Sequence, residues 1–322
     1  MPSHHEWLVI VLSAVFTPEP QEGLDIDRSV RRESDTVRHF RVIALTTTGR
    51  ERAGTYCAMP RAKINGIDIH YEVSGPGQSL LFLNGSGASL ADLAPLISLL
   101  AETFEVLAFD QRGIGKSPCP RGSYTMADLA ADALSLADQL EWEHFRLMGI
   151  SFGGMVAQEV AVTAPERIDR LALVCTSPGG EGGSSFPLDT LAEMDPDELA
   201  TVSAEIMDTR FTPEWLEHHE SDRMLAGALT ERHASNAATA DRGFALQLQA
   251  RRGHDVFERL PRITCPVLVA SGRYDGIAPL TNGAAIVSQI PHAELRLFEG
   301  GHAFFIQDPA AIPEVVAFLS AD

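Results

Sequence analysis

The chain has 322 residues, of which 45% are hydrophobic and 21% are charged. These values are ordinary for a folded protein with a sizeable core, and they exclude disorder over the whole chain. The formal net charge is −19, so the average field would repel a nucleic acid, and no basic patch of the kind that binds one is present. No apolar run approaches the ~20 residues that a membrane-spanning helix needs. We therefore expect neither a nucleic-acid partner nor a membrane partner.

Residues 1–58 differ in pattern from the rest of the chain, because prolines and mixed charges interrupt any sustained period. We expect a disordered or non-native extension, with Met59 as the biological start. Residues 7–16 have about the length of a signal-peptide core, but no positive charge precedes them and no clear cleavage site follows. The four cysteines form no Cys-x-x-Cys pair. These features favour a cytoplasmic protein over a secreted one.

Beyond residue 59 the chain alternates short apolar runs with stretches of helical period. Residues 67–73 alternate apolar and polar side chains, which is typical of an antiparallel edge strand. Later runs are continuous, as expected for strands buried on both faces; they are 80–83, 106–109, 145–148, 171–174, 267–270 and 295–298. Helices are expected at 91–100, 126–140 and 155–164, and a last one opened by Asp308 and Pro309. The pattern predicts an α/β fold with a mostly parallel sheet and helices on both faces.

This alternation stops after Cys175, where the glycine-rich residues 178–183 provide a flexible exit from the sheet. Residues 181–262 contain helical stretches and no convincing strand. We expect residues 59–180 and 263–322 to form one core and residues 181–262 to form a helical cap over the site. The alternative is that residues 181–262 pack away from the site.

The strongest motif is Gly-Ile-Ser-Phe-Gly at residues 149–153, directly after an apolar strand and before a helical run. A serine hydroxyl is a poor nucleophile, so it must be held exposed and close to a base. The small residues Gly149 and Gly153 permit the sharp strand-to-helix turn that exposes such a serine. We predict that Ser151 is a nucleophile.

A base and an orienting acid should follow the nucleophile along the chain. His302 comes after two glycines, just past the last expected strand, and Asp275 follows the strand at 267–270. We predict that His302 takes the serine proton and that Asp275 fixes the imidazole tautomer. Glu181 and Glu299 are the rival acids, and the alternative for Asp275 is an ordinary turn aspartate.

A tetrahedral intermediate also needs hydrogen-bond donors for its oxyanion. The amide of Phe152, directly after the serine, is one candidate. The second should come from the loop after the strand at 80–83, where Asn84, Gly85 and Ser86 lie, and we choose the amide of Ser86. The alternative is that this loop is only a glycine-rich turn. The residues at 110–117 are similar to a phosphate loop but do not complete one, and we interpret them as structural.

Taken together from about 62 to 320, these motifs resemble the α/β-hydrolase superfamily. The resemblance rests on the serine turn, the Asp-x-Arg-Gly-x-Gly-x-Ser loop at 110–117 and the chain order Ser, Asp, His. It implies an eight-stranded, mainly parallel sheet with a cap inserted after the sixth strand, and it requires no metal or organic cofactor. The chain looks closest to small-molecule esterases, enol-lactonases and carbon–carbon bond hydrolases. Members commonly carry His-Gly at the oxyanion loop, where this chain has Asn84 and Gly85.

The leading hypothesis is a serine hydrolase that cleaves a small carboxylic ester or lactone through an acyl-enzyme. The alternatives are cleavage of a carbon–carbon bond in a vinylogous diketone, and a non-catalytic member that binds a small ligand. The sequence indicates neither the natural substrate nor the oligomeric state.

Overall fold

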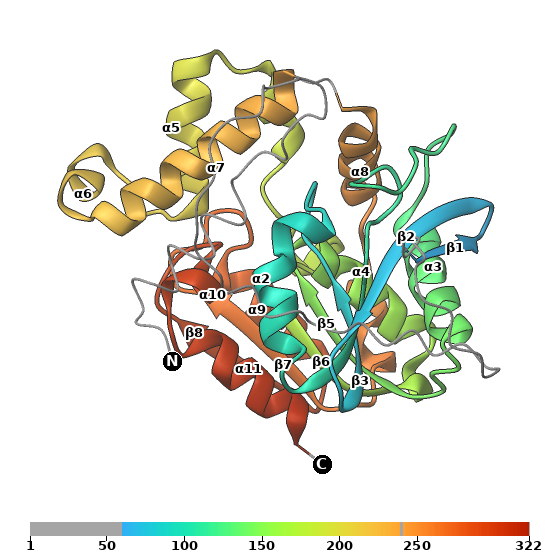
Figure 1. The fold of residues 1–322 in the computed structure, drawn as a ribbon. Coiled ribbons are helices and arrows are strands. Elements are labelled where there is room, and N and C mark those ends of the chain that lie inside the picture. The colour runs from blue at the N-terminus through green and yellow to red at the C-terminus, as the bar shows by residue number, and fades with distance from the viewer. Residues whose placement is uncertain (1–59, 239–240, 322) are drawn as a thin grey trace, which may run out of the picture. The chain divides into compact units, whose positions relative to one another are not determined.

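The structure is a computed structural model that describes residues 60–238 and 241–321. The expectations for residues 1–58 and for a start at Met59 lie outside these residues. The described chain forms one eight-stranded sheet in the order β1-β2-β4-β3-β5-β6-β7-β8 (Figure 1). β1 with β2 and β2 with β4 pair antiparallel, whereas all other neighbours pair parallel. The predicted eight-stranded, mostly parallel sheet is confirmed.

The strands are β1 (Arg61–Ile64), β2 (Ile67–Ser74), β3 (Gln78–Leu83), β4 (Phe104–Phe109), β5 (Phe145–Ile150), β6 (Ile168–Val174), β7 (Val267–Gly272) and β8 (Ala293–Phe298). The helices are α2 (Leu90–Leu100), α3 (Met126–Gln139), α4 (Phe152–Thr163), α5 (Pro196–Met207), α6 (Pro213–His218), α7 (Glu220–Ala238), α8 (Arg242–Arg252), α9 (Leu280–Gln289), α10 (Phe304–Gln307) and α11 (Ala311–Ser320). Short 3₁₀ turns are η1 (Pro165–Arg167), η2 (Gly180–Gly182), η3 (Leu188–Glu193) and η4 (Phe257–Arg262).

The edge of the sheet differs from the sequence-based expectation. β2 was expected at the edge, but β1 pairs along its outer side. A two-residue turn joins these strands, with Asn65 at φ 46° and Gly66 at φ 81°. Positive φ at both central positions matches the twist of a tight hairpin, and Asn-Gly is the residue pair that best adopts it. The hairpin therefore extends the sheet by one strand that the apolar pattern did not reveal.

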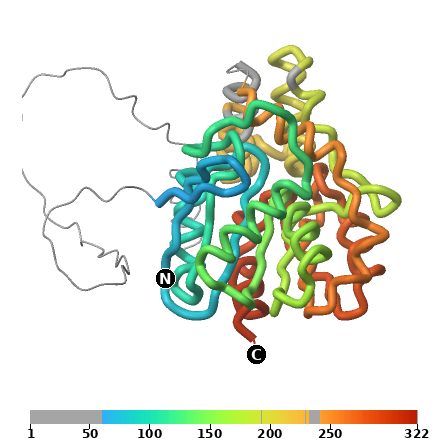
Figure 2. Tube along the Cα trace, turned by 90° about the vertical axis from the view of Figure 1, so that its right-hand side faces the viewer, coloured from blue at the N-terminus to red at the C-terminus, as the bar shows by residue number. Residues whose placement is uncertain are grey.

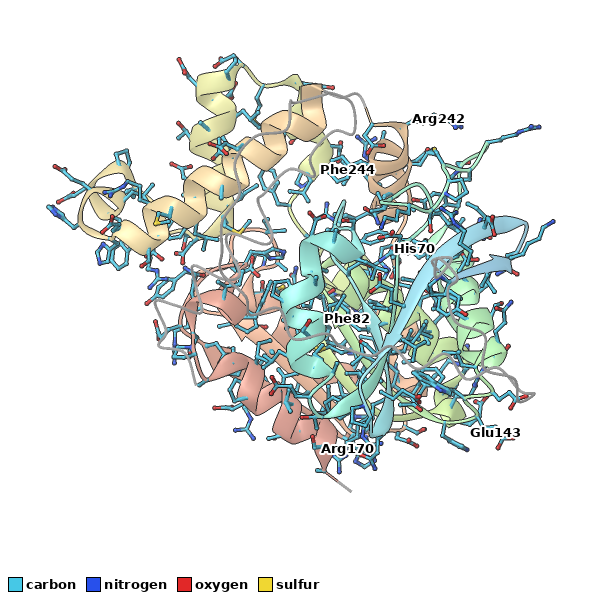
Figure 3. All side chains as sticks on the ribbon, viewed as in Figure 1. His70, Phe82, Glu143, Arg170, Arg242 and Phe244 are labelled. Carbon is cyan, nitrogen blue, oxygen red and sulfur yellow. The ribbon has the colours of Figure 1, made fainter. Side chains whose placement is uncertain are left out.

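Helices cover both faces of the sheet, as its strand composition requires. In β3, Leu81 and Leu83 pack in the cluster that contains α3, α4 and α9 residues, whereas Leu80 and Phe82 pack in the cluster that contains α2 and α11 residues. Phe82, labelled in Figure 3, accordingly lies inside the molecule beside α2. Successive side chains of a strand point to opposite faces, so a continuous apolar run is the pattern of a strand with helices on both sides.

Two helix boundaries also differ from the expectation. The helix expected at 155–164 begins at Phe152, directly after Ser151. The last helix was expected to open at Asp308 and Pro309, but α10 ends just before them and α11 begins at Ala311 without a side-chain cap. The Asp308 carboxylate instead accepts from the amides of Ala310 and Glu299. It therefore ties the end of β8 to the turn before α11.

The chain between β6 and β7, residues 175–266, is called the inserted segment below. It contains α5, α6, α7 and α8 and, within 175–238 and 241–266, no strand of the sheet. Its helices, yellow to orange, lie at the opposite end of the molecule from the C-terminus (Figure 1 and Figure 2). A third apolar cluster joins α5 and α7 to Ile277 and Ala303, which come from the loops after β7 and β8. Within the described residues, no helix is both long and apolar enough to cross a membrane.

Candidate active site

Ser151 lies in the turn between β5 and α4, with φ 53° and ψ −115°. A positive φ is strained for a residue with a side chain, and such strain persists only where neighbours impose it. The Ser151 amide donates to the Val174 carbonyl at 2.8 Å, and the Thr176 hydroxyl donates to the Ser151 carbonyl at 2.8 Å. Both partners belong to the carboxyl end of β6 or the residues after it. The neighbouring strand therefore holds the serine in its unusual conformation.

The glycines on either side of this turn are required by close backbone approaches. A Cβ at Gly149 would overlap the Gly153 carbonyl, and a Cβ at Gly153 would overlap the Leu83 carbonyl of β3. Neither position has room for any larger side chain. The Gly-x-Ser-x-Gly spacing that predicted Ser151 therefore places glycines where the start of α4 packs closely against the sheet.

The structure brings together the three residues predicted as nucleophile, base and acid. His302 Nε2 lies 2.9 Å from Ser151 Oγ, and its Nδ1 lies 2.8 and 3.0 Å from the Asp275 carboxylate oxygens. A carboxylate only accepts, so Nδ1 carries the proton and Nε2 is left to accept from the serine hydroxyl. The three groups therefore have the hydrogen-bond order of an acid, a base and a nucleophile.

Asp275 is buried, with 5% of its surface exposed. Its Oδ1 accepts from the amides of Ile277 and Ala278, both at 2.8 Å. Burial, followed by the nearby Asp275 carboxylate, raises the pKa of the Cys175 thiol well above its usual range. A buried thiol with a raised pKa stays protonated at neutral pH.

The two rival acids lie elsewhere. Glu181 is exposed in η2, and Glu299 pairs with Arg273 at 2.7 Å on the surface. Of the carboxylates in the described part of the chain, Asp275 is the one hydrogen-bonded to His302. The structure does not bring either glutamate to the imidazole.

The predicted oxyanion loop lies next to Ser151. A methyl group at Gly85 would be 3.7 Å from Ser151 Cβ. Ser86 follows in a turn that the Ala88 amide closes by donating to the Gly85 carbonyl at 3.3 Å. Phe152 is the first residue of α4, where amides have no partner within the helix. Donors could thus converge from both sides of Ser151.

Asn84 has a different position from its loop neighbours. Its side-chain amide donates to the Ala88 carbonyl, and its Oδ1 accepts from Gln111 Nε2 at 2.9 Å. The residue is 3% exposed. Asn84 therefore stabilises the loop through buried hydrogen bonds and does not face a ligand.

The inserted segment contacts both loops that carry His302 and Asp275, through backbone hydrogen bonds that sequence reasoning missed. The His302 amide donates to the Met207 carbonyl at the end of α5, at 2.6 Å, and the Gly276 amide donates to the Ile206 carbonyl at 3.1 Å. Cβ atoms at Gly276 and Gly301 would overlap this same end of α5. The two glycines are the only local sign of these contacts, and glycines in loops have many causes.

Gln247 of α8 was also missed. Gln247 accepts from the Gly87 amide at 2.7 Å and donates to Gln111 at 3.2 Å, so it ties α8 to the loop after β3. Figure 3 labels Arg242 and Phe244 at the start of the same helix. Polar residues at helical spacing do not reveal which face is buried.

The loop at 110–117 has structural contacts. Asp110 accepts from the amides of Leu90 and Lys116 at 2.8 and 2.9 Å and from His70 Nδ1 at 2.9 Å, and Arg112 pairs with Asp132. The Asp110 carboxylate thus ties this loop to β2 and to the start of α2. Across the described ranges, no group of three His, Cys, Asp or Glu side chains converges as metal ligands would.

Comparison with known proteins agrees with this architecture. The alpha/beta hydrolase fold family matches residues 78–309, and the chain belongs to this family. Its relatives are named as hydrolases, and it is an α/β hydrolase by fold and sequence.

Three similar proteins illustrate the range of activities for which its relatives are named. A poly(3-hydroxyalkanoate) depolymerase of Ectopseudomonas oleovorans is 31% identical over 76% of this chain and 84% of its own length. The 3-oxoadipate enol-lactonase 2 of Acinetobacter baylyi is 28% identical over 78% of this chain and 92% of its own. The crystal structure of the enol-lactonase from Burkholderia xenovorans LB400 superposes with a TM-score of 0.68 at 27% identity, covering 81% of this chain and all of that one.

Proposed function

We propose that this protein is a serine hydrolase that cleaves a small carboxylic ester or lactone through an acyl-enzyme. The observation that carries the proposal is the chain of contacts from Asp275 through His302 to Ser151, with both imidazole nitrogens engaged. A hydroxyl becomes a useful nucleophile only when a positioned base can remove its proton. This order of contacts supports that task.

The proposed reaction has two halves. Ser151 Oγ attacks the carbonyl carbon while His302 Nε2 takes its proton, and the amides of Phe152 and Ser86 hold the oxyanion. The carbon–oxygen bond of the alcohol then breaks, and the alkoxide takes the proton from His302. Water next attacks the acyl-enzyme with the same base, which releases the acid and restores the serine. Asp275 keeps the imidazole in one tautomer and stabilises its cation throughout.

The relatives support ester or lactone substrates. A poly(3-hydroxyalkanoate) and an enol-lactone, the substrates named for two of them, both contain a carboxylic ester linkage. We further propose that residues 181–262 act as a cap over this site, supported by the backbone contacts of α5 with the loops of His302 and Asp275. No metal or organic cofactor takes part in the proposed steps.

The test is hydrolysis of p-nitrophenyl acetate and butyrate, with fluorophosphonate labelling of wild type and Ser151→Ala. We expect both signals in the wild type and neither in the variant, with kcat reduced by about 10⁴-fold or more. Ser288→Ala, which changes an exposed serine on α9, is the matched control and should label and turn over as the wild type does.

The rival functions have distinct outcomes. Folded wild type that neither labels nor turns over esters, but cleaves a vinylogous diketone, would replace the proposal by carbon–carbon bond hydrolysis. Folded protein inactive on both panels would make it a ligand-binding member of the fold.

A further inference from the structure

Three buried side-chain amides connect the loop after β3 to α8 of the inserted segment. They belong to Asn84, Gln111 and Gln247, each of which is at most 3% exposed. Gln111 Nε2 donates to the backbone carbonyl and to Oδ1 of Asn84, at 3.0 and 2.9 Å. Gln247 Nε2 donates to Gln111 Oε1 at 3.2 Å, and Gln247 Oε1 accepts from the Gly87 amide at 2.7 Å. This amide chain therefore leaves the loop at Asn84 and returns to it at Gly87.

The two ends of the amide chain determine the orientation of both glutamines. A backbone amide only donates and a backbone carbonyl only accepts. The Gly87 amide therefore requires the oxygen of Gln247, and the Asn84 carbonyl requires the nitrogen of Gln111. The other two atoms then face each other as donor and acceptor. Asn84 Nδ2 donates to the Ala88 carbonyl, so every polar atom of the three side chains is paired. A fully paired buried network holds one geometry.

The helix that carries Gln247 is itself packed against the core. At its start, Arg242 donates to the Pro120 carbonyl at 2.8 Å. Gly243 lies so close to Gly113, in the loop after β4, that a Cβ on either glycine would overlap the backbone of the other. Gln247 follows one turn along α8. Its acceptor oxygen therefore reaches the loop after β3 from a helix held by separate contacts with the core.

The amide chain contacts the loop on both sides of the proposed oxyanion donor. Ser86 lies between Asn84 and Gly87 in the sequence, and a methyl group at Gly85 would be 3.7 Å from Ser151 Cβ. Gly87 has φ 66°, a region that glycine enters without steric cost, so its own backbone constrains the turn only weakly. An oxyanion donor is effective only when it is held in place before the charge develops. The side chains that hold this loop therefore bear on the rate of the proposed reaction.

We propose that Gln111 and Gln247 are positioning residues that hold the Ser86 amide in place for the oxyanion, so that α8 of the inserted segment contributes to the chemical step. This assignment rests on the proposed function. It predicts a loss in kcat with little change in KM, because the donor acts on charge that develops only in the transition state.

The activity test uses p-nitrophenyl butyrate and Gln247→Met, which keeps the length of the side chain and removes both of its hydrogen bonds. We expect kcat to fall by about 10- to 100-fold with KM within about threefold. Gln247→Glu retains an acceptor for the Gly87 amide and should lose less than about fivefold. Gln249→Met changes an exposed glutamine of the same helix and, as the matched control, should keep the kcat of the wild type.

Gln111→Met tests the other end of the amide chain and serves if Gln247→Met does not fold. It removes the donor to both oxygens of Asn84, and we expect a similar loss in kcat. Melting temperatures of all variants report stability separately from turnover. Equal losses in Gln247→Met and Gln247→Glu would overturn the role of the contact with Gly87.

A trifluoromethyl ketone with a propyl chain separates positioning from a general loss of stability. In the proposed site, Ser151 adds to its carbonyl carbon, His302 takes the serine proton, and the former carbonyl oxygen becomes the oxyanion. We expect the inhibition constant to rise in Gln247→Met by about the factor by which kcat/KM falls. A lower melting temperature with unchanged kcat and unchanged inhibition would make Gln247 a structural residue and overturn the assignment.

Failure of the assignment and failure of the proposed function give different results. Wild type that labels and turns over esters, with Gln247→Met and Gln111→Met equal to it in kcat, would reject the positioning role alone. Folded wild type that neither labels with fluorophosphonate nor turns over any ester would reject the proposed function and the positioning role with it.

Discussion

Two sets of buried polar groups, one in the loops of Ser151, Asp275 and His302 and one in the inserted segment, differ in how fully they are hydrogen-bonded. In the core, Asp275 accepts from two amides and from His302, and His302 in turn reaches Ser151. In the inserted segment, Arg251 and His254 are as deeply buried, yet each leaves polar atoms without a partner in the described chain. A fully hydrogen-bonded network holds one geometry, whereas a buried polar atom without a partner carries a desolvation cost. On our proposal, the core performs the reaction and residues 181–262 cover the site.

The largest effect on kcat should come from disrupting the hydrogen bonds between Asp275 and His302. In Asp275→Asn, the side-chain oxygen is expected to keep accepting from the amides of Ile277 and Ala278. Its NH₂ group then faces His302 and favours the tautomer with the proton on Nε2, which no longer accepts from Ser151. We expect kcat to fall by about 10⁴-fold with little change in melting temperature, measured on p-nitrophenyl butyrate. An activity near that of the wild type would show that Asp275 is only a turn residue.

A smaller effect on kcat should follow from disturbing the contact between α5 of the inserted segment and the His302 loop of the core. A methyl group in Gly301→Ala would overlap the Met207 carbonyl, to which His302 donates. Displacing the end of α5 should shift the imidazole, and a misplacement of about 1 Å can cost about 10²-fold in rate. The control is Gly227→Ala in α7, where a Cβ meets nothing within 4 Å, so that activity should persist. If both variants keep full kcat, the contact with α5 does not position the base.

The smallest effect is on the free energy of unfolding. It depends on pH and involves a residue of the inserted segment alone. Burial lowers the pKa of His254 from 6.5 to about 4, so the unfolded chain binds one more proton between these values. Stability from this group is complete above about pH 6.5 and is lost as the pH falls toward 4. The slope is at most about 1.4 kcal/mol per pH unit. His254→Gln, which can still donate to the Ser177 carbonyl, should flatten urea-unfolding free energies over this window; parallel curves for both proteins would contradict the burial argument.

Local sequence signals were sufficient where residues close in the chain decide the structure. Continuous apolar runs predicted the buried strands, and the glycines at 149 and 153 predicted the turn of Ser151. The hairpin of Asn65 and Gly66 also had a local signal, but its outer strand has four residues and alternates exposed with buried positions. So short a run does not stand out from a loop by its apolar content.

Asp308 shows where a local rule fails. Asp before Pro is a good opening for a helix, yet its carboxylate accepts from the Glu299 amide, nine residues away, as well as from Ala310. The rule describes what the side chain can do, and the position of β8 decides which partner it meets.

By itself, the sequence determined the alternation of strands and helices, the order Ser151, Asp275 and His302, and the place of the insertion, because each depends on residues close in the chain or on motifs with a fixed local geometry. Only the tertiary structure decided that α5 hydrogen-bonds to the His302 loop, that Gln247 accepts from the Gly87 amide and that two nitrogens of Arg251 are buried without a partner among the described residues. Those features depend on which face of a helix meets a distant loop and on which charges find partners there. Such contacts form between segments far apart in the chain, and short-range periodicity carries no record of them.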